Sequence, residues 1–176
     1  MRDSLVLTVV GPDRTGLVEA LAAQISAAGG NWEASHMARL AGQFAGILLV
    51  TIAPDATGTL LSALKALDAH GLAVTIHAAG DAADVPSTHT AFLELTGDDR
   101  VGIVRDVARV LAARGVNVEE LESEVTSAPM SGEALFTARA VLRIPAEHSL
   151  ALVRADLEAL ASELMVDLAA SDELDD

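Results

Sequence analysis

The sequence predicts an α+β protein made of two small domains, each with the element order βαββαβ. The stretch from Gly11 to Glu33 returns from Gly97 to Glu119 without a gap, and 10 of its 23 columns are identical, where average composition gives roughly two by chance. Each copy follows an apolar run with strand character and carries one helical stripe of apolar residues. The copies are 86 residues apart, which is longer than a solenoid repeat, and there are only two of them. The repeat therefore indicates two copies of one domain.

The chain length fits this division. With 176 residues there is room for two domains of about 80 residues, which we expect at residues 1–78 and 90–170. Residues 79–89 are small and polar with a proline, as in a linker, and residues 171–176 read as an acidic, frayed tail. Domains this small bury only about 60% of their unfolded surface, so packing against the twin or another subunit would add useful burial.

The elements of the first half follow from its apolar spacing. Residues 5–10 form a strand, and Gly11 is expected to end it by permitting a backbone turn. Leu17, Leu21 and Ile25 then fall on one helical stripe, which Gly29 ends as a C′ residue. Two strands at residues 31–40 and 43–53 are joined by a short hairpin, a second helix covers about 60–67, and a last strand covers 72–77.

The second half repeats this order. Its strands are expected at residues 91–96, 116–126, 134–144 and about 164–168, with helices after Gly102 and from about Ser149. Its hairpin loop, residues 127–133, is longer. Two split βαβ units per domain predict a four-stranded antiparallel sheet with both helices on one face.

Composition excludes several function classes. The formal net charge of −15 repels phosphate backbones, and none of the four aromatic residues sits in a basic cluster, so direct nucleic-acid binding is not expected. The absence of cysteine excludes thiol chemistry and fits a reducing cytoplasm. We expect no signal peptide and no membrane-spanning segment, because no basic start precedes an apolar run and no such run is long enough.

The candidate binding residues lie in and near the two glycine loops that precede the first helix of each half. Free N–H groups at a helix start suit an anion such as a carboxylate, and we expect an asparagine side chain close by across the strand ends. The candidate ligand-binding residues are Gly11, Pro12, Asp13, Arg14, Thr15, Gly16 and Asn31, and Asp98, Asp99, Arg100, Val101, Gly102 and Asn117.

Each of these residue types also has a purely structural interpretation. Asp13 and Asp99 could cap their helices, the two arginines could pair with surface carboxylates, and Asn31 and Asn117 could be turn residues after a glycine. The two loops also differ in charge. The first should be the better anion site, unless Asp98 turns outward or holds a ligand's ammonium group.

Several motifs resemble one known family. GPDRTGLV and MARLAGQFAGILLV in the first half, and DDRVGIV, RGVNVEEL and APMSGEALF in the second, are similar to tandem ACT domains, and among these to the glycine cleavage system transcriptional repressor type. The resemblance implies a ferredoxin-like fold, no catalysis, and a regulatory role in sensing small ligands, often amino acids, through the two glycine loops. Ser35 and His36 depart from the family's usual basic residue before the methionine.

Other chemistries find no support in the sequence. Gly11 to Gly16 has the spacing of a P-loop, but Leu17 and Val18 stand where lysine and serine or threonine are required. The five histidines share no metal-ligand spacing, and neither GxSxG nor HExxH occurs. We therefore expect a cytoplasmic, non-enzymatic, cofactor-free regulator, with no membrane contact, that binds an amino acid or related carboxylate, dimerises, and acts on a protein partner such as a transcription factor. The alternative is an interaction subunit that binds no ligand.

Overall fold

The computed structural model describes residues 2–80, 88–127, 132–160 and 164–170. The chain divides into two compact units, residues 1–83 and 84–176. Each unit is a four-stranded antiparallel sheet with two α-helices, so the predicted α+β class and βαββαβ order are confirmed. The expected tail, 171–176, and most of the expected linker lie outside the described residues.

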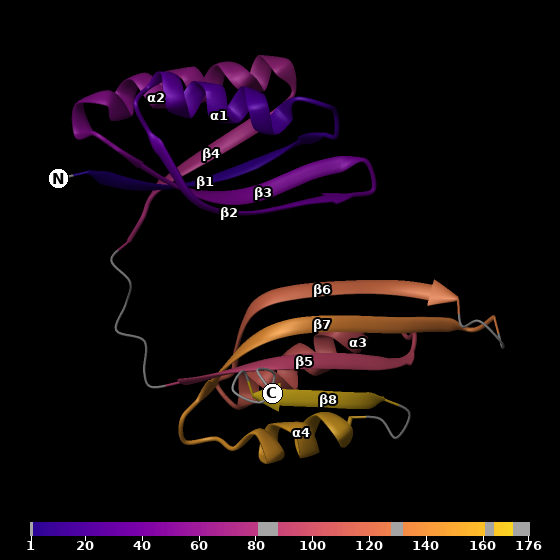
Figure 1. Cartoon of the computed structure of the whole chain (residues 1–176). Helices are drawn as coiled ribbons and strands as arrows, with labels where there is room; N and C mark the ends of the chain where they lie inside the picture. Colours follow the sequence, from indigo (N-terminus) through magenta and orange to yellow (C-terminus); the bar gives the residue numbers. More distant parts are fainter. Residues whose placement is uncertain (1, 81–87, 128–131, 161–163, 171–176) are drawn as a thin grey trace. The chain divides into compact units, whose positions relative to one another are not determined.

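The first domain has its two helices on one face of the sheet (Figure 1). The strands lie in the order β2-β3-β1-β4, which makes β2 and β4 the edges. The elements are β1 (Asp3–Pro12), α1 (Leu17–Ala27), β2 (Asn31–Leu40), β3 (Gln43–Ile52), α2 (Thr57–Lys65) and β4 (Ala73–Ala78), with 3₁₀ turns at Pro54–Ala56 and Ala66–His70.

The second domain repeats this topology with strand order β6-β7-β5-β8. Its elements are β5 (Thr88–Asp98), α3 (Ile103–Ala113), β6 (Asn117–Ser127), β7 (Ala134–Pro145), α4 (Leu150–Glu158) and β8 (Met165–Ala170). The hairpin between β6 and β7 includes residues 128–131, which lie outside the described part of the chain. No helix among the described residues is long and apolar enough to cross a membrane.

Each domain has its own apolar core between the sheet and its helices. The predicted stripes are confirmed: Leu17, Leu21 and Ile25 of α1 are buried, as are their counterparts on α3. They pack against alternate residues of the central strands, such as Leu7, which is fully buried. Within the described residues, every buried side chain is apolar.

Glycines end the first helix of each domain as predicted. Gly29 and Gly115 have φ of +73° and +64°, a left-handed conformation that glycine adopts without strain. The N–H of Gly29 donates to the Ser26 carbonyl and that of Gly30 to the Ile25 carbonyl, both at 2.9 Å. This is the Schellman pattern of a helix C-terminus, and the same two bonds recur after α3.

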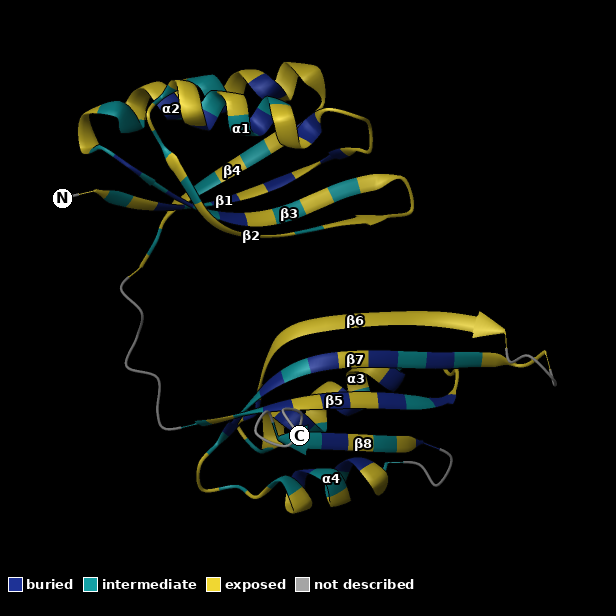
Figure 2. Ribbon diagram, in the orientation of Figure 1, coloured by how far each residue is buried: buried dark blue, intermediate teal, exposed yellow. Residues whose placement is uncertain are grey.

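The outer strands β2 and β6 are the exposed parts of the sheets (Figure 2). Every residue of β6 is exposed, including Leu121 and Val125. The turn from β2 to β3 is a two-residue hairpin in which Ala41 and Gly42 both have positive φ, as in a type I′ turn. An uncovered edge of this length is a place where another strand or chain can pair.

Candidate functional site

The first glycine loop joins β1 to α1 and touches the turn before β4. Gly11 does not turn the chain, contrary to our prediction, because β1 continues through it to Pro12. Its role is close packing: a Cβ at Gly11 would lie 2.2 Å from the carbonyl oxygen of Gly71. The positive φ that starts the helix belongs instead to Gly16, at +91°.

The interpretation of Asp13 and Asp99 as helix caps is wrong. The residues at the cap positions are Gly16 and Gly102, and neither helix start has a side-chain cap. Asp13 instead pairs with Arg39 of β2 at 2.7 Å. The backbone N–H of Asp99 donates to the Ala134 carbonyl at 2.9 Å. The first turns of α1 and α3 therefore keep N–H groups that no side chain caps, which is the feature an anionic ligand needs.

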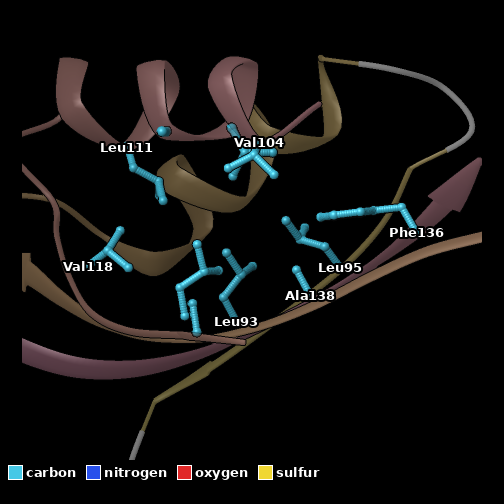
Figure 3. A pocket seen from close by; sticks show the side chains of 11 residues that line it. Leu93, Leu95, Val104, Leu111, Val118, Phe136 and Ala138 are labelled. Carbon is cyan, nitrogen blue, oxygen red and sulfur yellow. The ribbon is translucent and has the colours of Figure 1, made fainter. Parts of the chain in front are cut away.

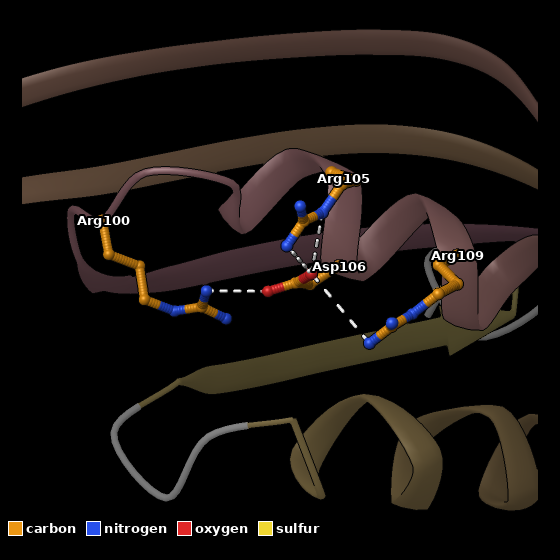
Figure 4. Close-up of polar contacts among 4 residues, drawn as sticks. All are labelled: Arg100, Arg105, Asp106 and Arg109. Carbon is orange, nitrogen blue, oxygen red and sulfur yellow. Dashed lines mark hydrogen bonds and ion pairs between the residues drawn. The ribbon is translucent and has the colours of Figure 1, made fainter.

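Both loop arginines bind groups of their own domain. The guanidinium of Arg14 donates to the His70 carbonyl at 2.9 Å, one residue before the Gly71 carbonyl that faces Gly11. Arg100 pairs with Asp106 at 2.7 Å, which confirms the structural interpretation of a pair with a nearby carboxylate. Figure 4 shows Asp106 between Arg100, Arg105 and Arg109.

Asp106 is the charged centre of the second site. Its side chain is 13% exposed, and the hydrogen bond from Arg100, followed by that from Arg105, holds the pKa of Asp106 below its ordinary value. Three guanidinium groups surround this one carboxylate, and with Asp98 and Asp99 in the preceding loop the positive and negative charges of residues 97–109 are equal in number. The equivalent positions in α1 carry Ala20, Glu19 and Ala23, so the arginine cluster belongs to the second domain alone.

The structure does not bring the asparagines to the loops of their own domains. Asn31 pairs with Thr51 of β3, whereas Gly11 pairs with Phe44 of the same strand. Seven residues of extended strand separate the two positions, about 23 Å. Asn117 and Gly97 are separated in the same way, since they pair with Arg143 and Phe136. The expectation of an adjacent asparagine is therefore wrong, because the helix returns the chain to the far end of the sheet.

The remaining loop residues are open to solvent. Pro12, Thr15 and Asp98 are exposed, and the Val101 side chain is fully so. Pro12 and Val101 have apolar side chains, and the side chains of Thr15 and Asp98 make no hydrogen bond or ion pair with another described residue. They are available to a ligand or a partner.

Two glutamates in an identical column of the repeat, Glu33 and Glu119, hold polar contacts that the sequence did not predict. Each is the extra residue of a β-bulge in the edge strand. Glu33 accepts hydrogen bonds from Thr51 Oγ1 at 2.7 Å and Asn31 Nδ2 at 2.9 Å, and these bonds lower the pKa of Glu33. Glu119 accepts from Arg143 Nε at 2.6 Å.

An apolar pocket lies between α3 and the sheet of the second domain (Figure 3). All 11 lining residues are apolar, among them Leu93, Leu95, Leu111 and Phe136, and the cavity volume is about 40 Å³. Three of the lining side chains, Val104, Val118 and Leu121, are exposed. No group of three or more histidine, aspartate or glutamate side chains suited to a metal occurs in the part of the chain that the structure describes.

Comparison with known proteins identifies the domains. The ACT domain family matches residues 3–78 and, separately, residues 91–161. The chain belongs to the ACT-domain family. It carries two ACT domains in tandem, as the sequence motifs suggested.

Two solved structures resemble this tandem ACT-domain protein over nearly its whole length. One is an unknown protein from Galdieria sulphuraria, with 30% identity and a TM-score of 0.80 over 97% of this chain and 99% of that one. The other is provisionally described as a glycine cleavage system transcriptional repressor, with 18% identity and a TM-score of 0.69 over 97% of this chain and 99% of that one. At this identity the second likeness shows the fold. A sequence search of curated proteins found no match.

Proposed function

We propose that this tandem ACT-domain protein is a non-enzymatic regulator that binds an amino acid or related carboxylate and acts on a protein partner. The observation that carries the proposal is the repeated helix start: two ACT domains each present N–H groups after a left-handed glycine, with no side chain capping them. A carboxylate there gains hydrogen bonds and a favourable helix-dipole interaction, worth about 0.3–1 kcal/mol where exposed.

The asparagines can join this site only if two domains meet. Each asparagine lies at the end of its sheet that is opposite to the glycine loop. One ligand can therefore contact a glycine loop and an asparagine only if the loop end of one domain meets the asparagine end of another. The exposed edge strands β2 and β6 offer the unpaired backbone groups for such a meeting. We include dimerisation in the proposal for this reason.

The proposed partner is a protein and not DNA. A net charge of −15 opposes binding to phosphate backbones, so a regulator of transcription with this composition has to act through another protein, such as a transcription factor. The likeness to a protein described as a glycine cleavage system repressor supports this role. A cytoplasmic location is part of the proposal and fits the lack of cysteine.

A ligand-free interaction subunit is the second candidate. It is favoured by the loop side chains that are already engaged, since Asp13 pairs with Arg39 and Arg100 pairs with Asp106. Isothermal titration calorimetry of the full chain against the twenty amino acids separates the two candidates. A sensor gives saturable heat with at least one amino acid, whereas an interaction subunit gives none at millimolar ligand.

A further inference from the structure

The sheet of the first domain has one face that its own helices do not cover. The helices α1 and α2 pack on the other face (Figure 1). The strand register arranges the described side chains of the uncovered face in five rows across the sheet, and none of them is aspartate, glutamate, lysine or arginine. We call this surface the first sheet face, and its rows are Asn31, Thr51 and Ser4; Ala34, Leu49, Val6 and His77; His36, Ile47, Thr8 and Thr75; Ala38, Ala45, Val10 and Ala73; and Leu40, Gln43 and Pro12.

Large apolar side chains of the first sheet face are open to solvent within the domain. Ile47, Val10 and Leu40 are 47%, 50% and 79% exposed. One carboxylate reaches a corner of the face, that of the bulge residue Glu33, which accepts hydrogen bonds from Thr51 and Asn31. The centre of the face is therefore free of charged side chains, in a chain whose net charge is −15.

The equivalent face of the second domain is charged. Thr8 pairs with Ile47 in the first domain, and Glu94 pairs with Arg139 at the same place in the second, where the two side chains form an ion pair at 3.0 Å. The rows of this second face hold six carboxylates and two guanidinium groups among the described residues: Glu94, Asp98, Glu120, Glu122, Glu124 and Asp167, with Arg139 and Arg143. The two domains share a fold but differ in the charge of this face.

This difference selects what can cover the first sheet face. Charged side chains packed against it would lose their water and find few partners there, which costs free energy. An acidic face such as that of the second domain is therefore a poor cover. A second copy of the first sheet face brings no charge to the centre of the contact, and two identical faces match each other around a two-fold axis, as in most homodimers.

The first sheet face is also large enough for a stable dimer. Its strands have 10, 10, 10 and 6 residues. With strands about 4.8 Å apart and a rise of about 3.3 Å per residue, the outline of the face is roughly 570 Å². Two such faces together bury roughly 1,100 Å², which exceeds the area of about 1,000 Å² that a specific interface needs.

We propose that two copies of this protein associate through their first sheet faces, which pack against each other as the two sheets of a β-sandwich do, about 10 Å apart. The small side chains of Ala38 and Ala45, among others, leave room for the larger ones of the partner. The inference rests on the dimerisation that the proposed function includes, and it names a surface other than the edge strands.

The test is the dissociation constant of the dimer, measured by sedimentation equilibrium of the full chain. Ile47→Arg and Thr8→Glu each place on the face the residue that the second domain carries at the equivalent position, Arg139 or Glu94, so the fold accommodates both. Each variant should raise the dissociation constant about a hundredfold or more, because each copy would bury an added charge. Phe92→Arg is the matched control, because Phe92 is 40% exposed on the equivalent face of the second domain, and it should stay within about twofold of the unaltered chain.

The outcomes separate this interface from the rest of the proposed function. Unchanged dissociation constants in both variants would overturn the inference and leave dimerisation to the edge strands. An equal loss of the dimer in Phe92→Arg would also overturn it, because the effect would not depend on the first sheet face. A monomer mass for the unaltered chain at tens of micromolar would overturn the inference together with dimerisation.

Two further measurements keep the test decisive. Circular dichroism and Trp32 fluorescence show whether each variant is folded, and if one of the two variants is not, the other decides. Calorimetry with amino acids is a separate result, so failure of the interface leaves ligand binding by the sensor to be judged on its own titration.

Discussion

Gly11→Ala tests the packing at the first glycine loop. The new Cβ would lie 2.2 Å from the Gly71 carbonyl oxygen, so the two atoms must move apart by about 0.8 Å to reach even the 3.0 Å that real contacts show. The obstacle is backbone: the Gly71 carbonyl carbon and Leu72 Cα follow at 3.2 and 3.3 Å. No side-chain rotation relieves the clash, and either β1 or the turn has to shift.

Gly11→Ala should therefore lower the free energy of unfolding of the first domain by about 3 kcal/mol, the upper end of the range for overpacking. For a domain of this size each kcal/mol lowers the unfolding midpoint by roughly 4–8 °C, so the first domain should unfold about 12–24 °C earlier. Trp32 is the single tryptophan of the chain and lies in this domain. Its fluorescence reports first-domain unfolding alone, while circular dichroism follows both domains.

Two other glycines provide matched controls. Gly58 lies in α2 with no atom within 4 Å of a new Cβ, and Gly58→Ala should stabilise by roughly 0.5–1 kcal/mol, as alanine does in helices. Gly16 has equally open surroundings but a φ of +91°, and Gly16→Ala should cost about 1–2 kcal/mol. If Gly11→Ala unfolds at the same temperature as the unaltered chain, the contact between the loop and the Gly71 turn is not as described.

Three further predictions concern charge and assembly. The pKa of Asp106 is lower in the folded than in the unfolded protein, so its ion pairs stabilise the second domain at pH values above the ordinary pKa of 3.8 and lose this effect as the pH falls through the folded pKa. Asp106→Asn should therefore lower the thermal unfolding midpoint, followed by circular dichroism, at pH 7, and should make that midpoint fall less steeply in acid. If the midpoints of the variant and the unaltered chain fall in parallel with pH, this prediction is wrong. Light scattering at tens of micromolar should give twice the chain mass of 18.1 kDa, through pairing or covering of the sheet edges, whereas a monomer mass would argue against it. A mobility-shift assay at physiological salt should show no sequence-dependent DNA binding; submicromolar specific binding would overturn the argument from charge.

The fold could be predicted because short-range sequence patterns determine its elements, and because the repeat shows most of these patterns twice. Apolar stripes set the helix faces, and glycines such as Gly29 and Gly115 end helices through bonds to residues three to five positions away. The two-residue hairpin at Ala41 and Gly42 is equally local. Patterns of this range do not depend on how the domain packs.

The errors at the site have nonlocal causes. The structural interpretation of Asp13 as a helix cap is wrong, because its carboxylate pairs with Arg39 of β2, which is distant in the sequence. The prediction that Asn31 lies near the loop across the strand ends is wrong, because helix α1 carries the chain to the opposite end of the sheet. The order βαβ alone separates the two positions, because parallel strands joined by a helix both start at the same end of the sheet.

The pocket could not be predicted from the sequence, because its walls come from β5, β6, β7 and α3. Trp32 and Val118 occupy the same column of the repeat, but only the register shows that both lie over the helix face of the sheet.

Two-dimensional ¹H–¹⁵N NMR of the labelled full chain, titrated with single amino acids, tests the central claim most directly. The glycines at the two helix starts, Gly16 and Gly102, have amides in the loops proposed to bind the ligand. The account predicts saturable shift changes centred on one or both loops. No shift change in either loop with any of the twenty amino acids at millimolar concentration would contradict the proposal that this protein is an amino-acid sensor.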